Sequence, residues 1–182
     1  MGERSDAVPL LAEVFRTYGF EGASLARITA GTGLGKGSIY NFFPGGKEEM
    51  AEAVLDEIDG WFRGQVFQPL RSASDVRQGV ADMFKAVGRY FQSGRKVCLV
   101  GVFALGHERD RFAVKVQSYF TEWVQALADA LRRGGRDADT ALALAEEVVG
   151  GIQGALVLAR AADEPELFMR ALARMAQRLN TV

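Results

Sequence analysis

The sequence predicts an all-α protein. Apolar residues recur at spacings of three and four over most of the 182 positions, which is the period of one face of a helix. The run from Val76 to Phe91 shows this spacing, and the alternation typical of strands is nearly absent. Three of the four prolines, Pro44, Pro69 and Pro165, fall between the periodic runs, so we expect them to separate helices without interrupting them.

Three short helices are expected in the first 43 residues. The first spans about residues 7–18, with Asp6 as its N-cap and Gly19 as a left-handed residue after its end. The second follows a Ser24 cap and ends near Gly33, and the third begins near residue 36 and stops at the Phe-Pro pair. Longer helices are expected over about residues 47–63, 75–92, 110–133, 138–161 and 166–179, with a short one near 98–105.

This change in helix length predicts a domain boundary in the Phe-Pro-Gly-Gly-Lys segment. Residues 1–46 are expected to form a compact three-helix unit, and residues 47–182 a larger helical body. The 22 basic and 23 acidic side chains give a net charge of -1, so an anionic polymer would be held by local charges and helix ends. The first 50 residues carry five Lys/Arg and six Asp/Glu, which adds no general attraction for such a polymer.

Several classes of protein are not expected. The single cysteine, Cys98, has no partner within the chain and the chain starts with charged residues, so we expect a reducing cytoplasm. The apolar windows are too short or too broken by glycine for the roughly 20 residues that span a bilayer, so no membrane is expected. One histidine, His107, and no nucleophile beside a base predict no catalytic residue, no metal and no cofactor. His107 is interpreted as a helix-end residue.

The segment from Ser24 to Lys47 has the pattern of a helix-turn-helix. Ile28 would pack inward from the first helix of the motif, Gly33 permits the tight turn, and Ile39 would anchor the second helix. The outward side of the second helix then carries small and polar residues that suit a DNA groove. We therefore predict DNA contacts from Ser24, Lys36, Gly37, Ser38, Tyr40, Asn41 and Lys47.

Six of these seven predicted contacts have a chemical reason. Lys36 can donate to guanine or to a phosphate, Ser38 to either, and Asn41 to a base edge or the backbone. Tyr40 offers a phenol to a phosphate, and Lys47 adds a cation where the next helix begins with free N–H groups. Gly37 leaves room for close approach. Two plainer interpretations stay open: a solvated helical corner, and a core position for Tyr40 beside its flanking phenylalanines.

The motif resembles the tetracycline-repressor (TetR) family of bacterial transcriptional regulators. Three departures are Gly35 in place of the usual serine cap, Thr32 in place of alanine, and Ala26 where a base-contacting arginine is sometimes found. The residues that carry the resemblance are Phe15, Gly19 and Phe20, Ala23-Ser24, Ile28, Gly33-Leu34, Lys36-Gly37, Ser38-Ile39-Tyr40, Phe43 and Lys47.

Glycines inside the predicted helix 138–161 indicate that something approaches it closely, because each costs roughly 1 kcal/mol relative to alanine. The resemblance implies that the last two helices pair with their copies in a dimer; an ordinary buried helix hairpin is the alternative. The residues expected in this interface are Gly150, Gly151, Gly154, Leu158, Phe168 and Leu172.

The resemblance also implies a ligand pocket in the larger body. Its expected lining, for which a plain aromatic core is the alternative, is Trp61, Phe84, Cys98, Phe103, Tyr119 and Trp123. Cys98 is either a small buried hydrophobe or a reactive thiol.

The sequence thus predicts a ligand-responsive homodimeric regulator that represses by binding a palindromic operator in double-stranded DNA and is released by a small apolar or aromatic effector. The alternative is an all-α ligand-binding or interaction module without specific DNA binding.

Overall fold

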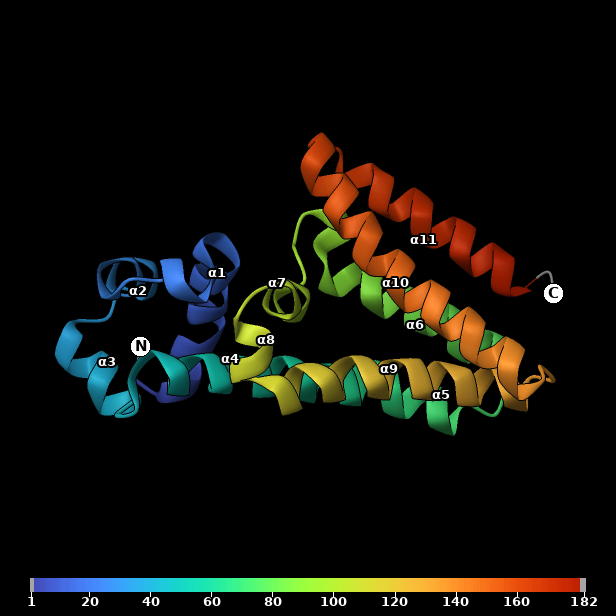
Figure 1. The fold of residues 1–182 in the computed structure, drawn as a ribbon, viewed down its shortest axis with the longest axis horizontal. Coiled ribbons are helices and arrows are strands. Elements are labelled where there is room, and N and C mark those ends of the chain that lie inside the picture. The colour runs from blue at the N-terminus through green and yellow to red at the C-terminus, as the bar shows by residue number, and fades with distance from the viewer. Residues whose placement is uncertain (1, 181–182) are drawn as a thin grey trace. The chain divides into compact units, whose positions relative to one another are not determined.

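The computed structural model describes residues 2–180, and every regular element in that range is a helix, as the apolar spacing predicts. The chain forms two compact units (Figure 1). The first contains Met1–Gly60 and Leu99–Val116, and the second contains Trp61–Cys98 and Gln117–Val182. The division falls within two long helices, so each of these contributes to both units.

The first unit contains the three N-terminal helices, two later helices, and parts of two more that continue into the second unit. Aromatic rings form part of its core: Phe20 lies 6.1 Å from Phe15, 6.3 Å from Phe103 and 5.6 Å from Phe112, measured between ring centroids. Its elements are α1 (Arg4–Gly22), α2 (Leu25–Thr32), α3 (Lys36–Phe42), most of α4 (Gly46–Phe62), α7 (Leu99–Leu105), α8 (Glu108–Arg111) and the start of α9 (Ala113–Arg133).

The second unit has a core centred on Phe62. Its elements are the π-helical turn η1 (Arg63–Phe67), α5 (Gln68–Ser72), α6 (Val76–Tyr90), the 3₁₀ turn η2 (Gln92–Gly94), the rest of α9, α10 (Ala138–Ala162) and α11 (Pro165–Asn180). Helices α10 and α11 pack side by side as a hairpin, and α11 also packs on α6.

The caps explain where prediction and structure agree. Helix α2 begins after Ser24, whose Oγ accepts from the Arg27 N–H at 3.3 Å, and ends at Gly33 in the left-handed region with φ 69°. Helix α1 begins earlier than predicted because Glu3, not Asp6, is its N-cap. Asp6 instead accepts from the backbone N–H of Glu3 at 3.2 Å, which closes a capping box.

Two further expectations about helix limits are wrong. The predicted helix 110–133 is two helices, α8 and α9, separated at Phe112, whose φ of −115° and ψ of 33° are not helical. The helix predicted to end at 63 continues through η1 into α5, so Pro69 lies in the first turn of a helix and not between helices. Proline lacks the N–H that would pair with the preceding turn, and the chain places it directly after the π-helical turn η1.

The boundary predicted after residue 46 concerns the extent of the DNA-binding domain, and it stays a prediction. The compact units divide the chain elsewhere because α7 and α8 pack with the N-terminal helices, α7 against α1.

Helix α10 has the length and apolar composition of a membrane span. Val148, Ile152 and Leu156 follow one another at a spacing of four, and all three are buried within the second unit. A core helix of a soluble protein passes the same test, so this composition is weak evidence for a membrane.

Candidate nucleic-acid interface and ligand core

The turn between α2 and α3 is tight and fixed from both sides. Gly33 donates its N–H to the Thr29 carbonyl at 2.9 Å and adopts a positive φ, which costs glycine little. Gly35 caps α3 without a side-chain hydrogen bond, as the missing serine predicts. Ile28 and Ile39, one on each helix, are fully buried. The two helices therefore form a rigid pair.

Thr32 has a role that sequence reasoning missed. Its side chain is 2 % exposed, and its Oγ1 donates to the Ile28 carbonyl at 2.7 Å and accepts from the Leu34 N–H at 3.3 Å. The hydroxyl thus bridges the last turn of α2 and the turn that follows. The signal in the sequence was the departure from alanine at this position, which a hydroxyl with two partners explains.

Close packing of α1 on α2 positions the motif. Gly31 lies so near Val14 that a Cβ at position 31 would collide with Cγ2 of that valine. The absence of a side chain at Gly31 therefore allows the two helices to approach.

The predicted DNA-contacting residues of α3 all lie on its exposed side. Tyr40 is 45 % exposed, which rules out the core position left open for it. Space around Gly37 is open, since a Cβ there would meet nothing within 4 Å. Lys36, Ser38 and Asn41 are exposed as well. Their neighbour Ile39 points the other way, into the core, so α3 presents one polar face to solvent.

Two backbone N–H groups where α4 begins are hydrogen-bonded within the chain. The Gly45 N–H donates to Oε2 of Glu49 at 2.6 Å, and the Gly46 N–H donates to the Phe43 carbonyl at 2.9 Å. Lys47 is half-buried, with its Nζ 4.6 Å from the centroid of the Phe20 ring. A phosphate near this helix end would therefore meet the Lys47 ammonium, while the Glu49 carboxylate opposes it.

Arg27 is an exposed cation of α2 that sequence reasoning did not select. Its guanidinium lies 4.2 Å from the centroid of the Tyr18 ring, and one NH group donates to the Gly22 carbonyl at 2.7 Å. These contacts hold the side chain in place beside Ala26. The signal was its position directly after Ala26, where it supplies a cation next to the position that lacks an arginine.

The predicted effector residues fall into two groups. Phe103 belongs to the core of the first unit, where its ring stacks on Phe112 at 5.6 Å. The other five lie in the second unit: Trp61, Phe84, Cys98, Tyr119 and Trp123.

Phe62, which was not predicted as a site residue, lies at the centre of the second group. Its ring centroid is 4.9 Å from that of Tyr119, 5.2 Å from that of Trp123 and 4.8 Å from that of Tyr90. The signal was its place beside Trp61 on a helix whose apolar spacing points it inward.

Two polar features lie within this aromatic core. The Cys98 Sγ is 4.0 Å from the Tyr119 hydroxyl, and both side chains are buried. The indole N–H of Trp123 is buried without an acceptor among residues 2–180. An unmet buried donor costs roughly 1–3 kcal/mol, so this N–H is an unfavourable feature of the core as it stands.

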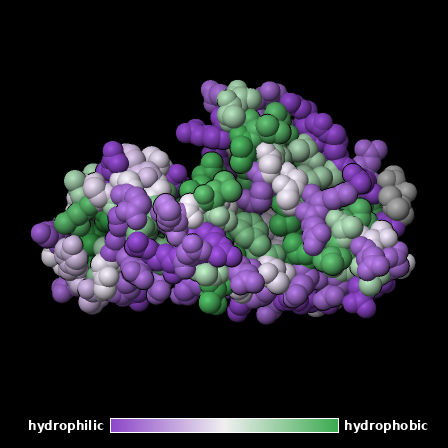
Figure 2. Space-filling view, viewed as in Figure 1, coloured by the Kyte–Doolittle hydropathy of each residue, from purple (hydrophilic) through white to green (hydrophobic). Residues whose placement is uncertain are grey.

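One side of α10 is open. Positions 150 and 154 have nothing within 4 Å of where a Cβ would be, and Val157 and Leu158 are 60 % and 58 % exposed. Gly151 differs, because a Cβ there would lie 2.9 Å from the Met175 sulfur on α11. Figure 2 shows hydrophobic residues gathered where α10 meets α11.

Two residues predicted for the dimer interface are core residues of the single chain. Phe168 is 0 % exposed and its ring meets that of Phe91 at 6.0 Å. Leu172 is buried beside Gly88 of α6. Both residues lie on the apolar side of α11, which faces α6 and η2 and is buried.

Comparisons with known proteins cover nearly the whole chain. Residues 11–54 match the family described as "Bacterial regulatory proteins, tetR family", and residues 71–174 match "Transcriptional regulator LmrA/YxaF-like, C-terminal domain". "HTH-type transcriptional regulator LmrA" of Bacillus subtilis is 23% identical over 159 residues, which is 85% of either chain. An uncharacterized HTH-type regulator, Rv0196 of Mycobacterium tuberculosis, is 25% identical over 87% of this chain and 84% of its own.

Solved structures agree with this assignment. A TetR transcriptional regulator from Legionella pneumophila has a TM-score of 0.80 at 20% identity and covers 98% of this chain and 97% of its own. A cysteine mutant of the TetR-family regulator CifR, complexed with 26bp operator DNA, has a TM-score of 0.77 at 27% identity and covers 100% and 98%. The chain therefore belongs to the TetR family of bacterial transcriptional regulators and is a DNA-binding regulator with an LmrA/YxaF-like C-terminal domain.

Proposed function

We propose that this regulator is a homodimeric repressor that binds a palindromic operator through α3 and is released by a small apolar or aromatic effector. The observation that carries the proposal is the polar face of α3, which is exposed while Ile28 and Ile39 hold the helix pair rigid from beneath. A rigid helix that presents short polar side chains fits a major groove. We place its action in the cytoplasm, where operator DNA is found.

On this proposal Lys36 and Asn41 contact base edges, while Tyr40 and Lys47 contact phosphates. Ser38 donates to either, and Gly37 lets the backbone approach the groove. Ser24 at the start of α2 adds a hydroxyl near the backbone. Because the N-terminal unit carries few cations, we expect few phosphate contacts and therefore a shallow dependence of affinity on salt.

A mobility-shift assay on the DNA upstream of the gene, at low salt, tests DNA recognition. Lys36→Ala is expected to change sequence preference and to weaken the preferred site by about 1–3 kcal/mol. Tyr40→Phe combined with Lys47→Ala is expected to weaken all sites about equally and to reduce the salt slope. Gly64→Ala, in η1 with open space around it, is the control. A protein that forms no sequence-specific complex would instead be a ligand-binding module.

The proposed dimer uses the open side of α10. Gly150 and Gly154 leave backbone uncovered, and Val157 and Leu158 are exposed apolar side chains on the same helix. Gly151, Phe168 and Leu172 pack within the single chain and are not assigned to the dimer contact itself. A two-fold axis here doubles the DNA contacts of one short helix on a palindrome.

The proposed effector binds among the aromatic residues of the second unit. Phe84 and Cys98 supply apolar surface there, and the unpartnered Trp123 N–H supplies a donor. Phe103 is a core residue of the first unit and is not part of the proposed effector site. The bound form would favour a state in which the two α3 helices no longer match successive major grooves, about 34 Å apart.

Tryptophan fluorescence tests the effector site, since Trp61 and Trp123 are the two tryptophans. An aromatic ligand with a carbonyl acceptor is expected to change the emission saturably and to release operator DNA. Trp123→Phe, which keeps one aromatic ring and removes the N–H together with part of the ring surface, is expected to weaken that ligand about fivefold to tenfold. Equal affinity in this variant would remove the assigned role of the N–H.

A further inference from the structure

A small hollow lies in the second unit, where the end of α11 meets the start of α6 and the turn between α9 and α10. Its volume is about 160 Å³. A cavity of roughly 150 Å³ is known to hold a benzene molecule, so the space suffices for a small organic ligand. The hollow is lined by Val76, Arg77, Val80, Leu131, Gly134, Arg136, Leu179 and Asn180.

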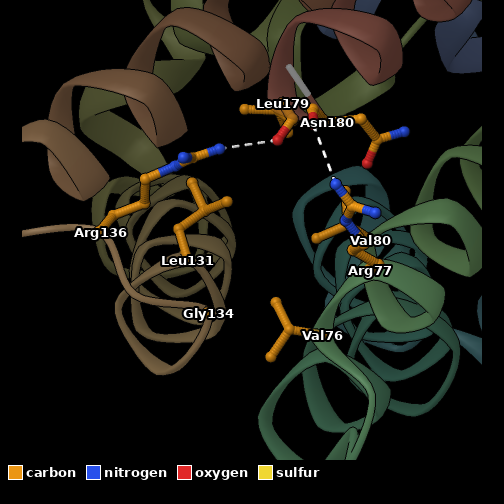
Figure 3. A pocket seen from close by; sticks show the side chains of 8 residues that line it. All are labelled: Val76, Arg77, Val80, Leu131, Gly134, Arg136, Leu179 and Asn180. Atoms are coloured by element: carbon orange, nitrogen blue, oxygen red, sulfur yellow. Dashed lines mark hydrogen bonds between the residues drawn. The ribbon is translucent and has the colours of Figure 1, made fainter. Parts of the chain in front are cut away.

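The lining combines two cations with apolar walls. Arg77 donates to the Asn180 carbonyl at 3.2 Å, and Arg136 donates to the Leu179 carbonyl at 2.8 Å. Figure 3 shows the two guanidinium groups on opposite sides of the hollow, each reaching the end of α11. Leu131 and Val76 face the space below them.

The described chain supplies no acid to balance these cations. Within residues 2–180 no carboxylate oxygen lies within 4.0 Å of either guanidinium, and none lines the hollow. The acids adjacent in sequence are used elsewhere: Asp75 accepts from the Gln78 N–H at 3.1 Å as the cap of α6. Asp137 caps α10 in the same way, and its hydrogen bonds from the Thr140 N–H and hydroxyl lower its pKa.

Helix capping accounts for only part of this arrangement. The end of a helix carries about half a negative charge, whereas the two arginines bring two full positive charges. Each guanidinium has five N–H donors, of which the α11 carbonyls use one, and the Nε of Arg136 is buried without an acceptor in the described chain. Donors and charge are therefore left over for a ligand.

We propose that this hollow binds a small carboxylate with a compact apolar group. The carboxylate accepts hydrogen bonds from Arg77 and Arg136, because guanidinium groups match the planar geometry of that anion. The apolar group packs on Val76, Val80 and Leu131. The site is separate from the aromatic core around Phe62 and does not depend on the proposed repressor function.

Titration calorimetry with benzoate tests the site in the full chain. We expect one-to-one binding with a dissociation constant of about 1 mM or less. The heat should then saturate by a benzoate concentration of about 10 mM. Benzamide, which has the same shape without the charge, is expected to bind at least tenfold more weakly. Inorganic phosphate, which has charge without the apolar group, is also expected to bind at least tenfold more weakly.

Variants assign the binding to this hollow. Arg77→Gln is expected to weaken benzoate at least tenfold, while Arg89→Gln, an exposed arginine on the same helix, is expected to leave it unchanged. Val76→Phe keeps both arginines and fills the hollow, so binding is expected to disappear while the circular dichroism of the helices stays the same. Three results would overturn the proposal: no saturable heat, equal affinity in Arg77→Gln, or phosphate binding as tightly as benzoate.

Discussion

Single polar atoms decide how the turn before α3 is held. The Thr32 hydroxyl is buried and takes part in two hydrogen bonds, one to the helix it ends and one to the turn it starts. A buried hydroxyl with both partners stabilises, whereas removal of it leaves those partners unmet. The residue therefore ties the orientation of α3 to the last turn of α2.

Replacement of Thr32 by valine tests this role. Valine keeps the shape and removes the hydroxyl, so we expect the free energy of unfolding to fall by about 1–2 kcal/mol. Urea denaturation followed by circular dichroism measures the change. Thr32→Ser keeps the hydroxyl and loses a methyl group, and it is expected to cost less than valine does. A valine variant as stable as the wild type would show that the hydroxyl contributes nothing net.

At the scale of helices, the sequence predicts best where a cap is strong. Ser24 and Gly33 define α2 to the residue, because each supplies a specific hydrogen bond or backbone conformation at the helix end. The break at Phe112 lacks such a signal, since no glycine or proline marks it and its ring packs into the core as a helical residue would. The contact of Phe112 with Phe20 joins residues far apart in sequence, so local spacing does not report it.

The residues of the candidate DNA-binding site were likewise predictable only where local sequence spacing decides which side of a helix faces outward. The α2–α3 spacing indicates which residues of α3 face outward, because Ile28 and Ile39 fix the inner face. It does not indicate that Glu49 accepts from the Gly45 N–H, or that Phe168 turns toward Phe91, because both depend on tertiary packing.

Packing between α1 and α2 provides a prediction at this scale. Gly31→Ala introduces a methyl group that collides with Val14, so we expect a loss of about 1–3 kcal/mol in the free energy of unfolding, measured by urea denaturation. The double variant with Val14→Ala removes the collision and is expected to lose less than the sum of the two single changes.

Gly37→Ala is the matched control for that substitution. It adds the same methyl group inside α3, where nothing lies within 4 Å, and is expected to raise stability by about 0.5–1 kcal/mol. If Gly31→Ala behaved like this control, the close approach of α1 and α2 would not limit the side chain at position 31.

For the whole molecule, self-association and DNA recognition are expected to depend on different helices of one chain. Among the described residues, Gly150 and Gly154 have open space where a Cβ would be, and Val157 and Leu158 are exposed, whereas Gly151, Phe168 and Leu172 are packed within the chain. A soluble protein seldom leaves such a patch uncovered. Operator affinity should therefore fall when α10 is altered, although α10 supplies no DNA contact.

Leu158→Glu tests that dependence. In a two-fold interface the substitution places two carboxylates near the axis, so we expect dimer affinity to fall by at least about a hundredfold, measured by sedimentation. Operator binding should fall with it, because one α3 alone reads only half of a palindrome. Leu105→Glu, at a leucine of the first unit that is 87 % exposed, makes the same change on α7 and should leave both measurements unchanged. An undiminished dimer in Leu158→Glu would place the interface on another surface, whereas loss of the dimer with full operator affinity would mean that single chains bind DNA.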